Sequence, residues 1–129
     1  INKVSNKRKK KRRKTDYLYK LRDDIGTLIR MTFVNRGYSK NTKSEKILGC
    51  SYEELVNHLE KQFVDGMNWD NKGEWEIDHI IPVSSSKDEE ELMILNHYTN
   101  LQPMWKKDNL KKKDFYLEED KIRFLKKFS

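Results

Sequence analysis

Residues 75–82 read Trp-Glu-Ile-Asp-His-Ile-Ile-Pro, and this stretch decides the fold. Trp75, Ile77 and His79 alternate with Glu76, Asp78 and Ile80. A period of two residues is typical of a β-strand. A proline and three serines follow closely and predict a loop. We therefore predict a strand over residues 74–81 and a loop after it.

The residues that follow predict a second strand and then a helix. Residues 88–95 predict a short acidic helix within the loop, and residues 101–104 predict a second brief strand. A further helix is predicted to begin near Lys107 or Asp108. The expected order is strand, long loop, strand, helix.

The rest of the chain predicts helices. Leu18, Leu21, Ile25, Leu28 and Ile29 recur at helical spacing, which predicts a helix from an N-cap at Asp16 to about Val34. A helical turn is expected over residues 45–48. A capping box at residues 51–54 starts another helix, and an amphipathic helix is expected over residues 117–128. The fold class is therefore α+β.

Composition predicts one small domain. With 129 residues and 35% hydrophobic content, the chain supports one modest core, and we assign residues 15–129 to a single domain. It has no apolar run that could span a bilayer and no secretory signal pattern, so we expect a soluble, intracellular protein. The single cysteine, Cys50, excludes an internal disulfide and a four-cysteine zinc cluster.

The charge is concentrated at the N-terminus. Of the 28 basic residues, nine lie in residues 1–14, which contain no acid and predict a disordered basic arm. Residues 15–129 carry the other 19 together with all 21 acids, a balance of −2. The net charge of +7 is therefore weak evidence that the folded part binds nucleic acid.

Three side chains around the strand suit phosphodiester hydrolysis. This reaction needs a base that prepares water for attack and a cation that holds the departing oxygen. His79 suits the first role because an unperturbed imidazole has a pKa of about 6.5. Asp78 and the amide oxygen of Asn109 suit the second, because Mg²⁺ takes one or two hard oxygen ligands from a protein.

These residues resemble a known family. Asp-His-Ile-Ile-Pro at 78–82, Asn-Leu at 100–101 and an asparagine at 109 resemble the pattern of HNH (ββα-metal) nucleases. It is the variant with Asn in place of the last His, as in the HNH domain of RNA-guided CRISPR nucleases. Over roughly residues 45–114 the chain resembles a group of small, mostly phage and bacterial HNH proteins. Trp105 and Asp108 occupy positions where family members with a structural zinc site have cysteines, so no structural zinc is expected.

The resemblance implies a fold and a reaction. The expected fold is a ββα-metal element over about residues 74–113, wrapped by about four helices. The expected activity is Mg²⁺- or Mn²⁺-dependent cleavage of double-stranded DNA that leaves a 5′ phosphate and a 3′ hydroxyl. Asp78 and Asn109 are implied as metal ligands, His79 as the general base, and Asn100 as the residue that fixes the loop presenting His79.

Basic residues in two places are expected to contact phosphate. Lys112 falls where family members often have a lysine facing phosphate. The full set of expected nucleic-acid contacts is Lys106, Lys107, Lys111, Lys112 and Lys113 around the last helix of the element, with Lys9, Lys10, Lys11, Arg12 and Arg13 in the arm.

Other interpretations of the sequence stay open. An HNH fold could bind nucleic acid without turnover, although such a module has no need of a base at His79. An RNA-directed HNH nuclease would share the chemistry and differ only in substrate. Trp69, Trp75 and Trp105 could stack on bases, but in so small a protein core packing is the commoner role. His97 could contact substrate or be packed.

Overall fold

The computed structural model describes the backbone of residues 2–129 and the side chains of residues 17–129. Six α-helices and a two-stranded antiparallel sheet make it an α+β fold, as predicted. The elements are α1 (Asn2–Asn35), α2 (Ser44–Leu48), α3 (Tyr52–Glu60), β1 (Trp75–His79), α4 (Glu89–Leu95), β2 (Leu101–Trp105), α5 (Lys106–Lys112) and α6 (Glu118–Lys126). Short 3-10 turns span Trp69–Asn71, Val83–Ser85 and Tyr98–Asn100.

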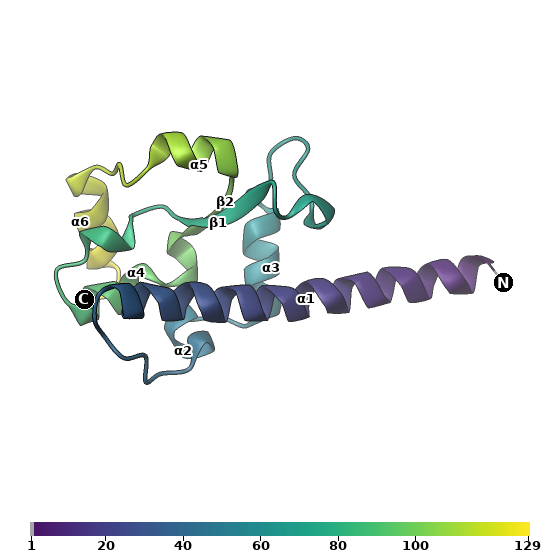
Figure 1. The fold of residues 1–129 in the computed structure, drawn as a ribbon, viewed down its shortest axis with the longest axis horizontal. Helices are drawn as coiled ribbons and strands as arrows, with labels where there is room; N and C mark the ends of the chain where they lie inside the picture. The colour runs from purple at the N-terminus through teal and green to yellow at the C-terminus, as the bar shows by residue number, and fades with distance from the viewer. Residues whose placement is uncertain (1) are drawn as a thin grey trace.

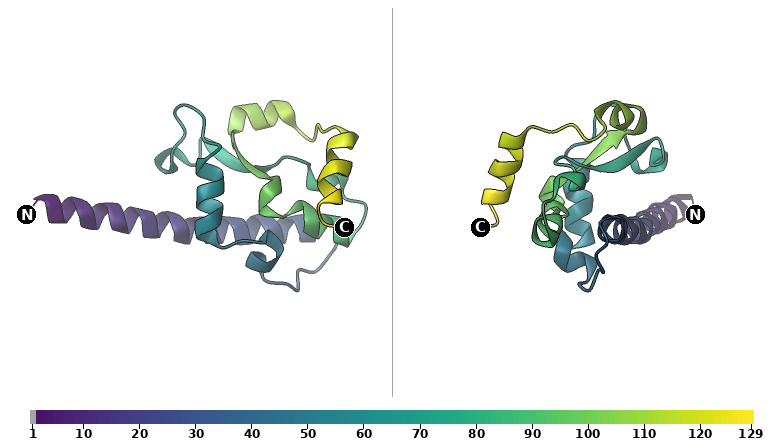
Figure 2. Two further views of the ribbon diagram at one scale, coloured as in Figure 1. Left: turned by 180° about the vertical axis from the view of Figure 1, so that it is seen from behind. Right: turned by 60° about the vertical axis from the view of Figure 1, so that its left-hand side comes forward.

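Helix α1 is longer than predicted. It runs through Asp16, which is therefore not an N-cap, and its N-terminal part extends beyond the rest of the chain (Figures 1 and 2). The backbone of residues 2–14 thus differs from the expected disordered arm, and Lys and Arg are good helix formers that can continue a helix once it has started. The expected phosphate contacts of Lys9, Lys10, Lys11, Arg12 and Arg13 fall outside the described side chains.

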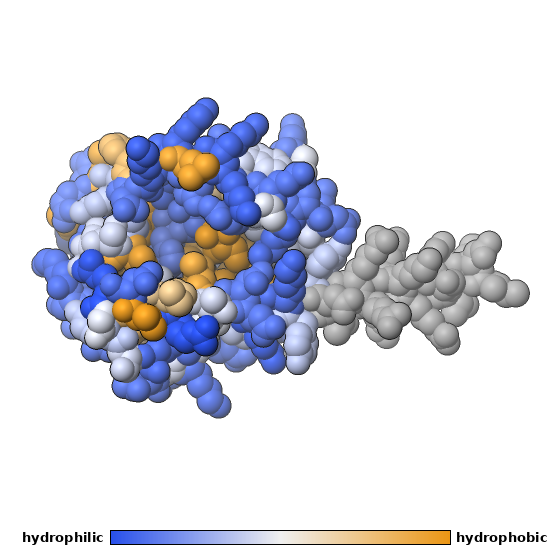
Figure 3. All heavy atoms as spheres, viewed as in Figure 1, coloured by the Kyte–Doolittle hydropathy of each residue, from blue (hydrophilic) through white to orange (hydrophobic). Residues whose placement is uncertain are grey.

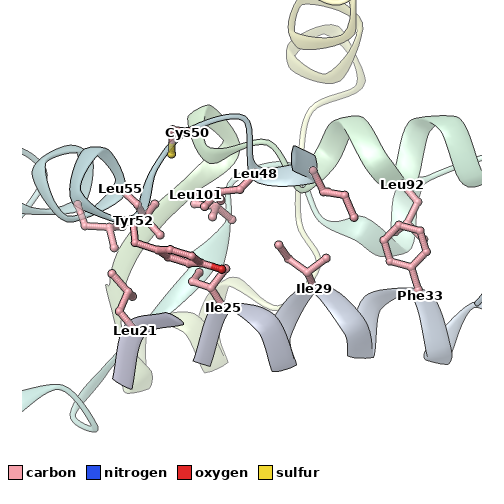
Figure 4. Packing of buried hydrophobic residues seen from close by; sticks show 12 residues of the cluster. Leu21, Ile25, Ile29, Phe33, Leu48, Cys50, Tyr52, Leu55, Leu92 and Leu101 are labelled. Atoms are coloured by element: carbon pink, nitrogen blue, oxygen red, sulfur yellow. The ribbon is translucent and has the colours of Figure 1, made fainter. Parts of the chain in front are cut away.

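The main core lies between α1 and the following helices. Leu21, Ile25, Ile29 and Phe33 follow one another at four-residue intervals, so they lie along one face of α1. Figure 4 shows this row pointing toward side chains of other elements. Its partners include Leu48, Tyr52, Leu55, Leu92 and Leu101. This packing anchors α1 to the body of the protein.

The sheet sits between this core and α5. β1 pairs antiparallel with β2, with Trp75 opposite Trp105 and His79 opposite Leu101. The strands were predicted to within a few residues, and α5 follows β2 directly, one residue before the predicted helix start. The capping box at Ser51 and Glu54 is present as predicted. Figure 1 shows α5 on one side of the sheet and α1 on the other.

Helix α6 closes the second small core. Ile81, Leu95 and Phe124 are buried together there. Lys121 is almost fully buried, and its ammonium lies 3.0 Å from Glu91 Oε1, which ties α6 to α4. Five helices thus surround the β1-β2-α5 unit, one more than expected. Among the helices of the described chain, none combines the length and apolar character needed to cross a membrane.

Candidate active site

Consecutive residues of β1 point to opposite sides of the sheet. Trp75 and His79 are buried on the side of the main core. Glu76 and Asp78 leave the strand on the other side, toward α5, because side chains alternate along a strand. Asp78 lies opposite Gln102 in the sheet register. The structure therefore places Asp78 and His79 next to each other at the end of β1 but on different faces.

Asp78 is held by two donors. Its Oδ2 atom accepts hydrogen bonds from Gln102 Nε2 at 2.9 Å and from Lys112 Nζ at 2.8 Å. The Lys112 ammonium also donates to the main-chain oxygen of His79 at 2.8 Å. Side-chain exposure is only 17% for Lys112 and 11% for Asp78, so this is a partly desolvated ion pair rather than a surface one. Lys112, predicted as a phosphate contact, thus lies within the site.

Asn109 faces the same side of β1. Its Nδ2 atom donates to Glu76 Oε1 at 2.6 Å, and α5 packs against both strands. Asn109 and Lys112 are three residues apart on α5, so they share one helix face. Among the described residues no protein donor reaches the Oδ1 atom of Asn109. The two expected metal ligands therefore both lie at the contact between β1 and α5, each hydrogen-bonded to a residue of the other element.

Few metal ligands are available at this contact between β1 and α5. Among the side chains that the structure describes, no group of three or more His, Cys, Asp or Glu could hold a metal ion. The oxygen ligands available to a metal ion are the Asp78 carboxylate and the Asn109 amide oxygen, with the Glu76 carboxylate beside Asn109. Such a set suits Mg²⁺, which keeps several waters, better than Zn²⁺, which prefers four nitrogen or sulfur ligands.

His79 is buried and hydrogen-bonded. Its Nε2 atom lies 2.8 Å from Asn96 Oδ1, and the residue is 8% exposed. Burial lowers the pKa of His79 below its ordinary value, which the Asn96 hydrogen bond and the Asp78 charge partly oppose and the Lys112 charge reinforces. The imidazole is therefore biased toward the neutral form, the form that can accept a proton.

Asn100 holds the turn that follows His79. Its Nδ2 atom donates to Ile81 O at 3.0 Å and to Leu95 O at 2.8 Å, and its Oδ1 accepts from Ile81 N at 2.9 Å. The main-chain oxygen of Asn100 accepts from Ile80 N at 2.8 Å. Asn100 is 1% exposed. One buried side chain thus fixes the backbone directly after His79, in the place that the resemblance implies.

The remaining lysines of this region are exposed. Figure 3 shows mostly hydrophilic side chains on this face and hydrophobic atoms in a hollow between α5 and α1. An open groove of about 590 Å³ is lined by Glu74, Trp105, Lys106 and Lys107. The exposed lysines around α5 are Lys106, Lys107, Lys111 and Lys113.

The other rings considered from sequence are packed. Trp75 is buried and donates its indole N–H to Asn68 O at 2.8 Å, while Trp69 lies edge-on to it with ring centroids 5.4 Å apart. His97 packs against Phe128 with ring centroids 4.8 Å apart. These contacts favour the structural interpretation for the three residues.

Sequence reasoning missed Glu76, Gln102 and Thr32; Asn96 was noted as lying close to the motif, but its contact with His79 was not predicted. The strand period alone could have indicated Glu76, since it lies two residues before Asp78 and so on the same face. The pairing register that places Gln102 beside Asp78 needs the structure. Asn96 and Thr32 are 64 residues apart and are joined by a hydrogen bond of 2.9 Å, which no local pattern predicts.

Comparisons with known proteins identify two similar chains. One is uncharacterized protein L246 of Acanthamoeba polyphaga mimivirus, 34% identical over 122 residues, which cover 88% of this chain and 50% of the relative. The other is uncharacterized protein L426 of the same virus, 32% identical over 119 residues, which cover 90% of this chain and 52% of the relative. No family model and no solved structure matches. The chain is thus similar to two proteins of this virus and spans about half their length.

Proposed function

We propose that the chain is a metal-dependent endonuclease with an HNH-type ββα-metal element that hydrolyses phosphodiester bonds of DNA. The observation that carries the proposal is the pairing of β1 with α5, in which Asp78 contacts Lys112 and Glu76 contacts Asn109. The β1-β2-α5 order agrees with the strand, strand and helix that the resemblance implies. Residues far apart in sequence are thereby gathered as one candidate site.

The donor set fits one divalent cation. Asp78 and Asn109 would hold Mg²⁺ or Mn²⁺ through a carboxylate and an amide oxygen, with the remaining positions left for water and phosphate. When bound, the ion would neutralise the charge that develops on the departing 3′ oxygen. Lys112 balances the charge of Asp78 within the protein and would have to share that carboxylate with the ion. No role is assigned to zinc.

His79 supplies the base. Its neutral ring can take a proton from a water molecule that attacks the phosphorus, and burial favours that neutral form. Because the side chains of Asp78 and His79 leave β1 on opposite faces, the scissile phosphate has to lie at the end of the strand, where both can be reached. Asn100 stabilises the backbone there through its three side-chain hydrogen bonds.

The substrate is proposed to be double-stranded DNA. The exposed lysines Lys106, Lys107, Lys111 and Lys113 surround the helix that carries Asn109, and clustered cations of this kind bind phosphate without regard to base sequence. Their position beside the site would bring a backbone phosphate toward Asp78.

A plasmid-nicking assay tests the proposal. We expect Mg²⁺ or Mn²⁺ to support cleavage, EDTA to abolish it, and His79→Ala to reduce the rate by about 10²- to 10⁴-fold, the usual contribution of a general base. Asp78→Asn should also abolish cleavage, whereas the exposed Asp65→Asn should not. Parallel assays on duplex DNA, single strands and RNA identify the substrate. Cleavage by His79→Ala at the wild-type rate, or faster cleavage of RNA, would contradict the assignment.

A further inference from the structure

A buried chain of hydrogen bonds joins His79 to helix α1. His79 Nε2 lies 2.8 Å from Asn96 Oδ1, and Asn96 Nδ2 lies 2.9 Å from Thr32 Oγ1. Asn96 directly follows α4 and is fully buried, while Thr32 lies on α1 and is 7% exposed. The three polar side chains meet where the sheet, α4 and α1 come together.

The direction of every bond in this chain is determined by its neighbours. The Asn96 amide also lies 3.1 Å from Leu92 O, a main-chain oxygen that can only accept, so the atom facing it has to be the Asn96 nitrogen. Thr32 Oγ1 donates to Ile29 O at 2.6 Å and is thus available to accept from the second N–H of Asn96. The remaining atom of the amide, Oδ1, is an acceptor and faces His79.

It follows that His79 Nε2 carries a hydrogen. An amide oxygen cannot donate, so a hydrogen bond between these two atoms requires an N–H on the ring. In a neutral imidazole the lone pair then resides on Nδ1. Among the described residues Nδ1 has no protein partner, and no fully buried side-chain nitrogen or oxygen there lacks one. Nδ1 therefore keeps contact with solvent.

We propose that Asn96, oriented by Thr32, is a positioning residue that fixes His79 in the Nε2–H tautomer and leaves Nδ1 as the atom that takes the proton from water. The proposal deepens the nuclease function and rests on it for the role of His79. It also assigns a part in the site to α1, the helix that continues from the basic N-terminal segment. A purely structural network would stabilise the fold and set the same tautomer but would leave kcat unchanged in folded variants.

Nitrogen NMR of the wild-type protein tests the tautomer without any enzymatic assay. With ¹⁵N-labelled histidine and mildly alkaline buffer, we expect the His79 ring, identified by the signals lost in His79→Gln, to show a protonated Nε2 and an unprotonated Nδ1. Asn96→Ala should convert the ring to a mixture of both tautomers. A proton on Nδ1 in the wild type, or an unchanged tautomer in a folded Asn96→Ala, would overturn the proposal.

Cleavage kinetics test whether the orientation of His79 affects catalysis. Substitutions of Thr32 should have a smaller effect than those of Asn96, because Thr32 acts on His79 only through Asn96. Thr32→Val keeps the side-chain shape but removes the hydroxyl, whereas the matched Thr32→Ser keeps the hydroxyl. We expect Asn96→Ala to lower kcat by about 10- to 100-fold, the usual effect of removing a partner that orients a functional histidine, with little change in KM for DNA. Thr32→Val should lower kcat more than Thr32→Ser, and equal kcat values would remove Thr32 from the proposal. If even the wild type cleaves nothing, the nuclease function fails while the NMR result still decides the tautomer.

Discussion

The ammonium of Lys112 lies 2.8 Å from the carboxylate of Asp78 and donates as well to the main-chain oxygen of His79. One cation thus links α5 to two adjacent residues of β1. Because both charged side chains are mostly buried, neither can be removed without leaving the other poorly compensated. The same carboxylate is the proposed metal ligand, so Lys112 and a bound divalent cation would compete for one group.

This competition predicts the behaviour of Lys112→Met. Without metal, the Asp78 carboxylate keeps only Gln102 as a donor, and we expect a loss of about 1–3 kcal/mol in the free energy of unfolding. Excess Mg²⁺ should restore more of that stability than it adds to the wild type, because it replaces the missing charge. Thermal unfolding in EDTA and in Mg²⁺ measures both effects, with the exposed Lys111→Met as the control. Equal Mg²⁺-induced shifts in Tm for all three proteins would contradict it.

The lowered pKa of His79 predicts the pH dependence of cleavage. Burial penalises the imidazolium, so the ring stays neutral below its ordinary pKa of 6.5. Since the base acts in its neutral form, the acid limb of kcat should lie below pH 6.5. The free energy of unfolding should depend on pH in the same direction. A histidine whose pKa is lowered in the folded state stabilises the protein fully above pH 6.5, and this stabilisation is lost as the pH falls through the folded-state pKa.

Two measurements check this dependence. The ring proton signals of His79 should titrate with a midpoint below 6.5, and kcat at saturating metal and DNA should fall over the same pH range. His97 also has a pKa lowered by burial, with His58 adding to the effect, so His97→Gln serves as the control and should leave the acid limb in place. A midpoint at or above 6.5 for His79 would refute the prediction.

The role of Asn100 predicts a loss of stability together with activity. Asn100→Ala would leave Ile81 N, Ile81 O and Leu95 O without their partner, at a cost of about 3 kcal/mol if each bond contributes about 1 kcal/mol. The turn after His79 should also loosen, so kcat should fall even where the variant is folded. Urea unfolding and single-turnover cleavage check the two effects against Asn41→Ala, which changes an exposed asparagine. Identical unfolding midpoints for both variants would contradict the role.

Local patterns predicted the elements of the site better than its contacts. The alternation around Asp78 predicted β1, and the capping box at Ser51 predicted the start of α3, because both signals depend on neighbouring residues. The segment before Asp16 was expected to be disordered because like charges repel, but helix propensity also acts there and the backbone is helical.

The contacts depend on tertiary packing instead. Thr32 reaches Asn96 only because the apolar face of α1 packs beside α4, and Asn109 reaches Glu76 only because α5 lies across the sheet. Such pairs join residues more than thirty positions apart. No period or cap in the sequence indicates which of several asparagines will be buried and which will remain exposed.

The last prediction concerns the nine basic residues of segment 1–14. Residues 15–129, by contrast, carry a formal net charge of −2. Each phosphate contact releases a counterion and contributes about −0.9 to the slope of log K against log salt on B-DNA. Deleting the segment should therefore flatten that slope by several units if most of the charges engage DNA. The rate at saturating DNA should change little, because Asp78 and His79 lie far along the chain.

Two variants separate this segment from the lysines of α5, and His79→Ala in each prevents cleavage during the binding measurement. Replacing Lys106, Lys107, Lys111 and Lys113 with glutamine should flatten the salt slope by at most about 4 units, since four charges are removed. In the cleavage-competent background the same replacement should also lower kcat/KM, because these lysines surround the helix that carries Asn109. Deleting residues 1–14 should flatten the slope further and leave kcat near the wild-type value. If the deleted and full chains show equal slopes across a salt series, the segment makes no contact with DNA, and the electrostatic attraction belongs to α5 alone.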